Sequence, residues 1–369
     1  MIRKIIIMLT AFIAFTGCSQ NSPELSSGQN SLEELKLKDY RPKSIYKVPK
    51  TSIEKPAFPI IDIHSHDYAQ NAEEIDEWVK LMDKFGIEKT VILSMQTGKG
   101  YDSVRAVYSK YPDRFEIWCG IDYTGYNTDK DWTKNAIKEL ERCHKLGAKG
   151  VGELGDKGEG LIYSKPTKAY GLHIDDKALE PIWSKCAELG MPVNIHVAEP
   201  IWMYAPIDST NDGLMNGYSW HVDLTKEGIL DHGGLMKTLD NALASNPQTT
   251  FIACHFANCS YDLQILGNML DKHPNLWADI SARYAETAPI PKYMNEFYKK
   301  YQDRLLYGTD NAPTEKMYMT TFRILESEDE HFYEIEMFNY HWPLYGFGLP
   351  KPILEKLYQT NALRIQNTK

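Results

Sequence analysis

The sequence has no dense cluster of lysine and arginine, and its formal net charge is -9 over 369 residues. Such a balance gives no general attraction to phosphate backbones or anionic lipids, so we expect no nucleic-acid partner. With 43% hydrophobic and 12% aromatic residues, the chain can bury one large core or two modest ones. Its composition therefore indicates an ordinary globular protein.

The sequence also lacks paired cysteine spacing. It contains no C-x-x-C motif, and five cysteines lie beyond the amino-terminal segment: Cys119, Cys143, Cys186, Cys254 and Cys259. An odd number at irregular spacing does not indicate a disulfide framework. We interpret most of these cysteines as small apolar residues in strands or helices.

The apolar run at the amino terminus is shorter than the ~20 residues of a transmembrane helix. It follows a basic start at Arg3 and Lys4 and leads to small residues before Cys18, which is typical of a secretion signal. Its end, FTGC, resembles the lipobox of bacterial lipoproteins, in which the cysteine is lipidated after cleavage. We therefore predict a lipoprotein signal peptide over residues 1–18 and an exported protein that Cys18 anchors to a membrane of the bacterial cell envelope. A plain signal peptide with an incidental cysteine is the alternative.

Residues 19–57 are rich in Ser, Asn, Gln, Lys and Pro and contain few apolar anchors. This composition predicts a polar tether in front of a folded body at residues 58–369. The segment SIYKVP could instead pack along the body as an arm, and both interpretations stay open.

From residue 58 onward, short β-rich runs alternate with longer helical segments, as in parallel α/β folds. Eight such runs occur: PIIDIH, KTVILSM, RFEIWCGI, KGVGELG, PVNIHV, TFIACHF, NLWADIS and RLLYGTD. This count predicts a (β/α)8 TIM barrel, which usually takes ~250 residues, with long loops at its C-terminal mouth. A doubly wound open sheet would usually show a glycine-rich phosphate turn after its first strand, and none follows IIDIH.

Two insertions, after the fifth and eighth predicted strands, are rich in aromatic residues. The first also contains too much Gly and Asn for a regular helix. In a barrel, both would lie over the C-terminal mouth, where loops shape the substrate pocket. Trp202 and Tyr204 of the first insertion are our candidates for substrate contact. The alternative, for each aromatic residue taken singly, is that it packs its loop onto the barrel.

Polar residues stand at the carboxyl ends of the predicted strands. They are His64 and His66 in the first, Glu153 in the fourth, His196 in the fifth, His255 in the sixth and Asp310 in the eighth. Singly, each is weak evidence, because a lone histidine at a strand end is often a hydrogen-bonded structural residue. In a closed barrel, however, these strand ends converge on one small region.

This convergence predicts a metal site. Alternate residues of a strand share a face, so His64 and His66 project to the same side and can bind one metal. His196 supplies a third nitrogen and Asp310 an anionic oxygen, a mixture suited to Zn or another divalent transition metal. Asp310 could also accept a proton from water that the metal activates.

The motifs DIHSH, NIHVAEP, ACHFAN and YGTDNAP, in this order, resemble the metal-dependent amidohydrolase superfamily. The terminal PILEKLYQTNALRI resembles the closing helix of the amidohydrolase-2 branch, which also contains aminocarboxymuconate-semialdehyde decarboxylase-like enzymes. The resemblance covers residues 58–369. It implies a (β/α)8 barrel with a metal at its mouth.

The resemblance assigns four ligands of the main metal: His64, His66, His196 and Asp310. It leaves two roles open. His255 either hydrogen-bonds and helps to activate the water, as in mononuclear members, or binds a second metal, as in binuclear ones. Glu153 resembles the fourth-strand carboxylate of binuclear TatD-type hydrolases, and it either binds metal or orients a histidine from outside the ligand set. We therefore expect one or two divalent ions, Zn first, with Mn also compatible.

The segment WADISAR places Asp279, Ser281 and Arg283 at alternating positions of the seventh predicted strand, hence on one face. The planar guanidinium of Arg283 could bind a substrate carboxylate. It could equally pair with Asp279 or Glu286.

We therefore expect a hydrolase in which metal-activated water attacks an amide, lactone or other ester of a small substrate, including carboxylate-bearing or aromatic ones. One alternative is a metal-dependent decarboxylase of an aromatic or unsaturated acid. Another is a lipid-anchored binding protein that keeps the barrel without turnover. The sequence does not specify the substrate or the oligomeric state, and a homo-oligomer is compatible with it.

Overall fold

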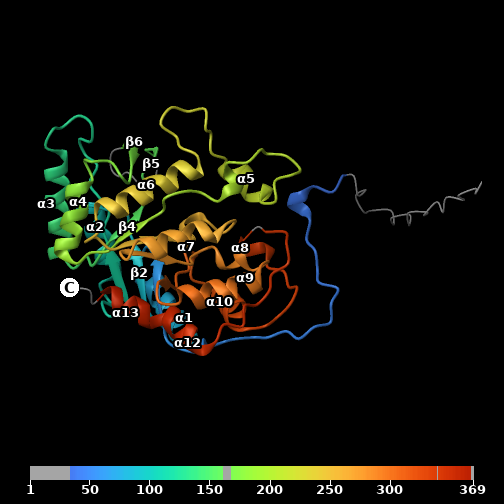
Figure 1. The fold of residues 1–369 in the computed structure, drawn as a ribbon. Helices are drawn as coiled ribbons and strands as arrows, with labels where there is room; N and C mark the ends of the chain where they lie inside the picture. The colour runs from blue at the N-terminus through green and yellow to red at the C-terminus, as the bar shows by residue number, and fades with distance from the viewer. Residues whose placement is uncertain (1–33, 161–167, 339, 367–369) are drawn as a thin grey trace, which may run out of the picture. The chain divides into compact units, whose positions relative to one another are not determined.

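The computed structural model describes residues 34–160, 168–338 and 340–366 (Figure 1). The predicted signal peptide and its lipidation residue, Cys18, lie outside these ranges. The chain divides into two compact units, Met1–Tyr40 and Arg41–Lys369. In the first unit, the described residues include a short 3-10 helix, η2, at Leu37–Asp39. All further elements belong to the second unit.

Eight parallel strands form the centre of the second unit, and each coincides with one of the eight predicted runs. They lie in two sheets, with the hydrogen-bonded orders β1-β2-β3 and β10-β9-β8-β7-β4. The strands are β1 Ile60–Ser65, β2 Ile87–Leu93, β3 Phe115–Trp118, β4 Val151–Leu154, β7 Val193–Ile195, β8 Phe251–Ala253, β9 Leu276–Asp279 and β10 Leu305–Leu306.

Two further contacts join these sheets into a closed barrel. A parallel bridge between Cys119 and Val151 links the end of β3 to β4. On the other side, the backbone N–H of Ile63 donates to the carbonyl oxygen of Tyr307 at 3.1 Å, which links β1 to the residues after β10. The predicted (β/α)8 barrel is therefore confirmed.

Helices follow the strands and surround the barrel (Figure 1). Local signals explain their ends: at the start of α1, the side chain of Asn71 accepts from the N–H groups of Glu73 and Glu74, and Gly86 ends the helix at φ 69. The helices of the barrel wall are α1 Ala72–Phe85, α2 Gly98–Tyr108, α3 Trp132–Lys145, α4 Glu180–Leu189, α6 His232–Ser245, α7 Leu263–Lys272, α9 Pro291–Tyr301 and α10 Glu315–Glu326. The carboxy-terminal part adds α12 Lys351–Glu355, the π-helix η5 Lys356–Thr360 and α13 Asn361–Gln366.

Shorter elements lie in the connections. The first insertion contains η3 (Ile201–Met203) and a seven-residue helix, α5 (Leu214–Trp220), so our expectation of no regular helix there is wrong over this short stretch. The segments η4 (Cys254–Asn258) and α8 (Tyr284–Thr287) follow β8 and β9, and α11 (Ile335–Phe338) lies in the second insertion. An antiparallel hairpin, β5 (Lys157–Glu159) and β6 (Tyr170–His173), follows β4 and was not predicted.

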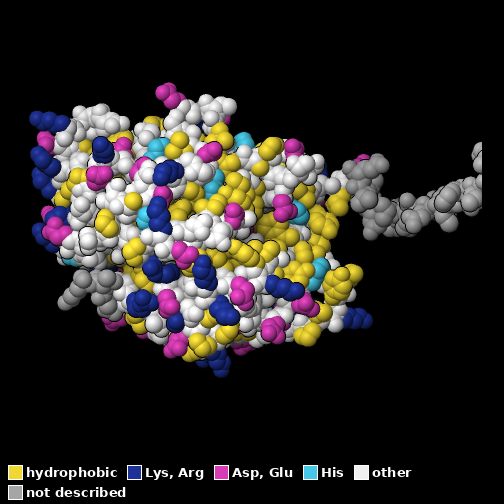
Figure 2. Space-filling view, in the orientation of Figure 1, with side chains coloured by type: hydrophobic (Ala, Val, Ile, Leu, Met, Phe, Trp, Pro, Cys, Tyr) yellow, Lys and Arg dark blue, Asp and Glu magenta, His cyan; other side chains and the backbone are white. Residues whose placement is uncertain are grey.

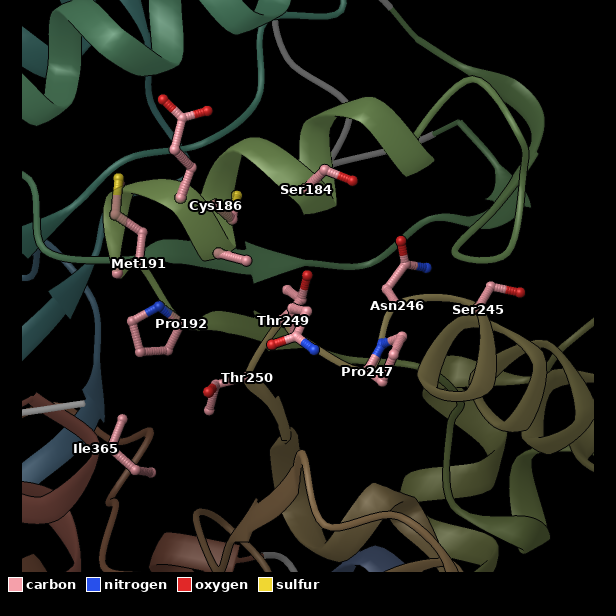
Figure 3. A pocket seen from close by; sticks show the side chains of 14 residues that line it. Ser184, Cys186, Met191, Pro192, Ser245, Asn246, Pro247, Thr249, Thr250 and Ile365 are labelled. Atoms are coloured by element: carbon pink, nitrogen blue, oxygen red, sulfur yellow. The ribbon is translucent and has the colours of Figure 1, made fainter. Parts of the chain in front are cut away.

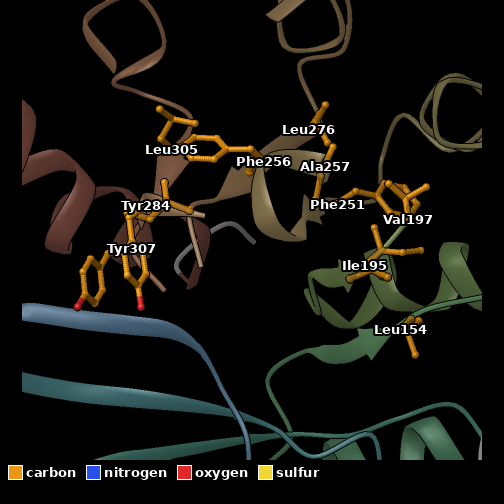
Figure 4. Close-up of a cluster of buried hydrophobic side chains, with 14 of the residues drawn as sticks. Leu154, Ile195, Val197, Phe251, Phe256, Ala257, Leu276, Tyr284, Leu305 and Tyr307 are labelled. Carbon is orange, nitrogen blue, oxygen red and sulfur yellow. The ribbon is translucent and has the colours of Figure 1, made fainter. Parts of the chain in front are cut away.

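Apolar side chains fill the space between the strands and the helices. Figure 4 shows part of this core, in which the buried residues Leu154, Ile195, Phe251, Leu276 and Leu305 come from five strands. A smaller cluster joins strand residues such as Ile61, Ile252 and Leu306 to Ile365 of α13. The core therefore fixes the strands on both faces. The carboxyl ends of the strands lie at the mouth of the barrel, where polar side chains can form a site.

Residues 41–57 have no regular secondary structure but contact the barrel unit. The backbone N–H and the hydroxyl of Thr51 donate to the carboxylate of Asp329 at 2.8 and 2.6 Å. The hydroxyl of Ser44 lies 3.1 Å from Nδ1 of His331. The segment SIYKVP thus lies against the folded body. None of the helices in the described ranges is long and apolar enough to span a membrane.

Candidate metal centre

The two histidines of the first strand face one centre. Nε2 of His66 lies 3.1 Å from Oδ1 of Asp310, and Nε2 of His64 lies 3.8 Å from the same oxygen. The pairing of β1 with β2 shifts in register between Asp62 and Ser65, which marks an irregularity at the strand end. The histidines therefore converge as predicted, although the simple alternation behind that prediction does not hold through the end of β1.

Glu153, at the end of β4, lies among the histidines. Its Oε1 is 2.8 Å from Nδ1 of His196 and 3.4 Å from Nε2 of His255. Its Oε2 is 3.4 Å from Nε2 of His66 and 3.9 Å from Nε2 of His64. The carboxylate is almost fully buried, so its charge is balanced by these imidazoles or by a cation.

Asp310 closes the opposite side of the centre. It follows β10, and its backbone N–H donates to the carbonyl oxygen of His64 at 2.8 Å. A Cβ at Gly308 would lie 2.7 Å from Cβ of His64, so glycine allows the last strand to approach the first. The Asp310 carboxylate is also 3.7 Å from Nε2 of His255.

Polar groups behind the histidines orient them. Nδ1 of His64 lies 2.9 Å from Oδ2 of Asp279, and Nδ1 of His66 lies 3.0 Å from the carbonyl oxygen of Leu93. Nδ1 of His255 lies 2.9 Å from the carbonyl oxygen of Ser281. Each of the three Nε2 atoms is thereby turned toward the shared centre.

His196 approaches the centre with its other nitrogen. Its Nδ1 faces Glu153, and its Nε2 lies 3.2 Å from Oε2 of Glu199. The other oxygen of Glu199 forms an ion pair with the ammonium of Lys157. These two residues continue the polar network away from the centre.

The charges of the centre shift its pKa values. Burial alone would lower the pKa of His64, but the neighbouring Asp279 carboxylate raises it to about 9. Burial raises the pKa of Asp310, yet the hydrogen bond from His66 brings it below its usual range. Burial lowers the pKa of His255, which favours the neutral imidazole that a ligand or a proton acceptor needs.

The neighbouring histidines also shift the pKa of Glu153. Burial alone would raise it, but the neighbouring histidines, His196 first, hold it well below its usual range. Glu153 therefore stays a carboxylate, as a metal ligand must.

The residues present fit a divalent metal ion. Nε2 of His64 is buried and has no hydrogen-bond partner in the described part of the chain, although it points between two carboxylates. Two groups of ligand-type atoms lie within 4.8 Å of one another and share His64: His64, His66 and Asp310, and His64, Glu153, Cys254 and His255. Histidine nitrogens with carboxylate oxygens are the donors that Zn and similar metals prefer. Cys254 differs from the others, because its thiol donates to Oδ1 of Asn194 at 2.8 Å.

A cavity of about 500 Å3 opens from the centre. Beside the metal-ligand candidates His66, Glu153, His196, His255 and Asp310, its lining includes the apolar residues Met95, Trp202, Met203, Trp220, Met337, Phe338 and Tyr340. Figure 2 shows hydrophobic side chains gathered on the face where Figure 1 places α5 and α8. The predicted aromatic mouth is therefore present, with Trp202 in the lining.

Tyr204, the other predicted substrate contact, does not line this cavity. Its hydroxyl accepts from the backbone N–H of Glu199 at 3.1 Å, and its ring makes an edge contact with His232. The 3-10 helix η3 turns the chain between Trp202 and Tyr204, so the two side chains face different surroundings. We therefore assign Tyr204 to the packing of the loop.

Arg283 lines the cavity, but from a different element than predicted. The strand β9 ends at Asp279, and Arg283 precedes α8, so the expectation of one alternating strand face is wrong. Ala282 adopts a positive φ of 53, which turns the chain after the strand. The Arg283 Nε donates to Asn258 at 2.8 Å and lies 3.1 Å from a carboxylate oxygen of Glu286. Its Nη1 donates to the carbonyl oxygen of Ala282 at 3.2 Å.

A second cavity, of about 570 Å3, lies at the other end of the barrel (Figure 3). Its lining includes Pro192, which precedes β7, and Thr250, which precedes β8. It therefore opens at the amino ends of the strands and contains none of the metal-ligand candidates.

Several residues of the network were not predicted. Asp279 was considered as a partner of Arg283, whereas it pairs with His64. Glu199 and Lys157 were not singled out at all. Glu199 stands three positions after His196 in NIHVAEP, and this short spacing is the signal that could have identified it.

The closed barrel and the donor set at its carboxyl ends define a metal-dependent enzyme built on a TIM barrel. The family model described as Amidohydrolase matches residues 53–365, so the chain belongs to the amidohydrolase family. None of the curated proteins matches the chain.

Solved structures of low sequence identity share the fold. A putative amidohydrolase from Staphylococcus aureus is 16% identical, with a TM-score of 0.55 over 84% of this chain and 100% of that one. An uncharacterised TIM-barrel protein from Bordetella bronchiseptica is 17% identical, with a TM-score of 0.53 over 84% and 98%. A 5-carboxyvanillate decarboxylase from Novosphingobium aromaticivorans, solved with manganese and 4-hydroxy-3-methoxy-5-nitrobenzoic acid, is 14% identical, with a TM-score of 0.51 over 85% and 97%.

Proposed function

We propose that the protein is a metal-dependent hydrolase that cleaves an amide, lactone or other ester of a small substrate. The observation that carries this proposal is the position of Asp310. Its carboxylate is 3.1 Å from Nε2 of His66, and its side chain is 23% exposed, against 4% for Glu153. It is therefore the acid of the ligand set that a substrate and a water molecule can reach.

The ligand set of this proposal is His64, His66, His196, His255, Glu153 and Asp310. One or two divalent ions bind there, with Zn preferred and Mn as the alternative. When bound, such an ion acts as a Lewis acid and lowers the pKa of water toward neutrality.

The protein's own residues supply the remaining steps. Asp310 accepts the proton of the attacking water and returns it to the leaving amine or alcohol. His255, which stays neutral, holds its Nε2 beside Asp310 and Glu153. Arg283, which lines the cavity, offers its guanidinium to a carboxylate of the substrate, and Trp202 covers the apolar part of the substrate.

Arg283 and the aromatic lining favour a second candidate, a metal-dependent decarboxylase of an aromatic or unsaturated acid. Both functions would use the same metal centre. They differ in the bond that breaks: in a hydrolase water adds to the substrate, and in a decarboxylase the product is smaller by carbon dioxide.

Metal quantification followed by a substrate screen tests the proposal. Purified wild type and Asp310→Asn would be assayed with lactones, N-acyl compounds and aromatic acids. We expect bound Zn or Mn, and hydrolysis of a lactone or N-acyl compound by wild type that Asp310→Asn loses. Release of carbon dioxide from aromatic acids without any hydrolysis would establish the decarboxylase instead. A wild-type protein that binds no divalent metal would contradict both functions.

A further inference from the structure

We propose that Glu199, held by Lys157, is a positioning residue that fixes the orientation and the tautomer of His196 at the metal centre. The proposal rests on the proposed metal-dependent function and identifies residues outside its ligand set.

The two ring nitrogens of His196 have different surroundings. Nδ1 lies 2.8 Å from Oε1 of Glu153 and faces the centre, whereas Nε2 lies 3.2 Å from Oε2 of Glu199. A neutral imidazole has one N–H group and one lone pair, and a metal binds the lone pair. His196 can offer Nδ1 to a metal only when its hydrogen is on Nε2. Both nitrogens face carboxylates, and a carboxylate only accepts hydrogen bonds. When a metal takes the Nδ1 lone pair on the side of Glu153, Glu199 accepts the hydrogen of Nε2 and stabilises the tautomer that binds the metal.

Glu199 is itself fixed from two sides. Its second carboxylate oxygen forms an ion pair with the Lys157 ammonium, whose side chain is only 6% exposed. Its backbone N–H donates to the hydroxyl of Tyr204 at 3.1 Å. The ion pair holds the Glu199 carboxylate in place beside His196, and the Tyr204 contact holds its main chain.

Lys157 is the first residue of β5, in the β5–β6 hairpin. The hydroxyl of Tyr123 donates to the carboxylate of Asp156, immediately before Lys157. Immediately after it, Gly158 has a φ of +86, and a Cβ there would lie 2.4 Å from the carbonyl oxygen of Gly228. The main chain on both sides of Lys157 is thus held against other loops. The hairpin therefore contributes to the site, because it places the Lys157 ammonium beside the Glu199 oxygen that does not face His196.

Stability alone does not account for this pair. Removing two opposite charges from water costs about as much free energy as their attraction returns, so a buried ion pair contributes little net stability. Glu199 also lines the cavity of the metal centre. A carboxylate placed between a metal-ligand histidine and a buried lysine is explained by its effect on that histidine.

Metal binding by the purified full chain tests the proposal. Apparent affinities for Zn and Mn would be measured by competition with a chromophoric chelator for wild type, Glu199→Ala, Glu199→Gln and Lys157→Met. Glu139→Gln is the matched control, since Glu139 is an ion-paired carboxylate of similar exposure on α3, 16% against 20% for Glu199. We expect Glu199→Ala to weaken metal binding by about 10- to 100-fold, Glu199→Gln by less, and Glu139→Gln not at all.

A double-mutant cycle separates the two residues. If Lys157 acts through Glu199, the variant Glu199→Ala/Lys157→Met binds metal no more weakly than Glu199→Ala alone. Additive losses would overturn the role of Lys157, and wild-type metal affinity in Glu199→Ala would overturn the role of Glu199. Thermal unfolding of the metal-free proteins identifies any variant that fails to fold. If Glu199→Ala fails to fold, the metal affinity of Glu199→Gln decides whether Glu199 positions His196. A wild type that binds no metal would instead refute the proposed function itself.

Discussion

Nδ1 of His64 lies 2.9 Å from Oδ2 of Asp279, and both side chains are fully buried. This contact turns Nε2 of His64 toward the centre and raises the pKa of the imidazole to about 9, against the lowering effect of burial. Without a metal, His64 therefore carries a proton at neutral pH. The same contact orients the ligand and makes a proton compete with the metal.

Metal binding should consequently strengthen with rising pH. A bound ion must displace the proton of His64, so below about pH 9 the apparent affinity should rise by about tenfold per pH unit for that proton alone. Chelator competition in buffers between about pH 6.5 and pH 8.5 measures this slope. An affinity that stays constant over this range would show that His64 is neutral before the metal binds.

Replacement of Glu153 by alanine should lower metal content. The carboxylate lies within 3.4 Å of nitrogens of His66 and His255, and its loss leaves the centre with one anionic donor fewer. We expect at least a tenfold weaker metal affinity, by analogy with the loss of a residue that orients a ligand, which costs about 10- to 100-fold. Metal analysis of dialysed protein gives the result. Unchanged metal content and activity in Glu153→Ala would show that Glu153 only supports the histidines and would favour a mononuclear centre.

Asp310→Asn should reduce turnover while the fold is kept. The amide cannot accept the proton of the attacking water, and a positioned general base contributes about 10²- to 10⁴-fold. Steady-state kinetics on a substrate from the screen, with metal content measured in the same samples, tests this expectation. Full activity in a variant that retains its metal would mean that Asp310 does not act as the base.

Arg283→Met should discriminate between substrates. A hydrogen bond to a charged group contributes about 1.5–3 kcal/mol, which predicts a KM higher by about 10- to 100-fold for carboxylate-bearing substrates. Neutral substrates should be unaffected. Arg283→Lys, which keeps the charge but loses the planar fork, should lie between wild type and Arg283→Met. Equal losses for charged and neutral substrates would assign Arg283 to the support of Glu286 alone.

Lipidation of Cys18 is tested separately in a bacterial host. We expect incorporation of radiolabelled palmitate into the wild-type chain and recovery of the protein with membranes, because several acyl groups anchor firmly. Cys18→Ser should lose both properties. Label that persists in this variant would place the acyl group at another residue, and a wild-type chain that takes up no label would contradict lipidation.

The eight strands could be predicted because each is a short buried run between turn signals, and such runs are local properties of the chain. Because the strands close into a barrel, the polar residues at their carboxyl ends could be expected to lie close together without any information on individual contacts. The positions of His196 and Asp310 near this region could be predicted in this way, since they depend on the strand ends alone, and their roles as metal ligands stay a prediction.

Contacts made by loops could not be predicted in the same way. The hairpin that carries Lys157 has strands of three and four residues, too short for a clear alternation. Arg283 leaves the strand direction because Ala282 adopts a positive φ, which no local pattern indicated. The pairing of Asp279 with His64 depends on the distance between two strands that are far apart in sequence.

The closure of the barrel has a consequence for the order of events during folding. The backbone of Asp310 donates to the carbonyl of His64, so the first and the last strands meet at the metal centre. Neither a nascent chain nor a truncated one that lacks the last strand can assemble the full donor set. A metal ion held by the full donor set would therefore bind only the folded barrel, and its binding energy would stabilise the native state as a whole.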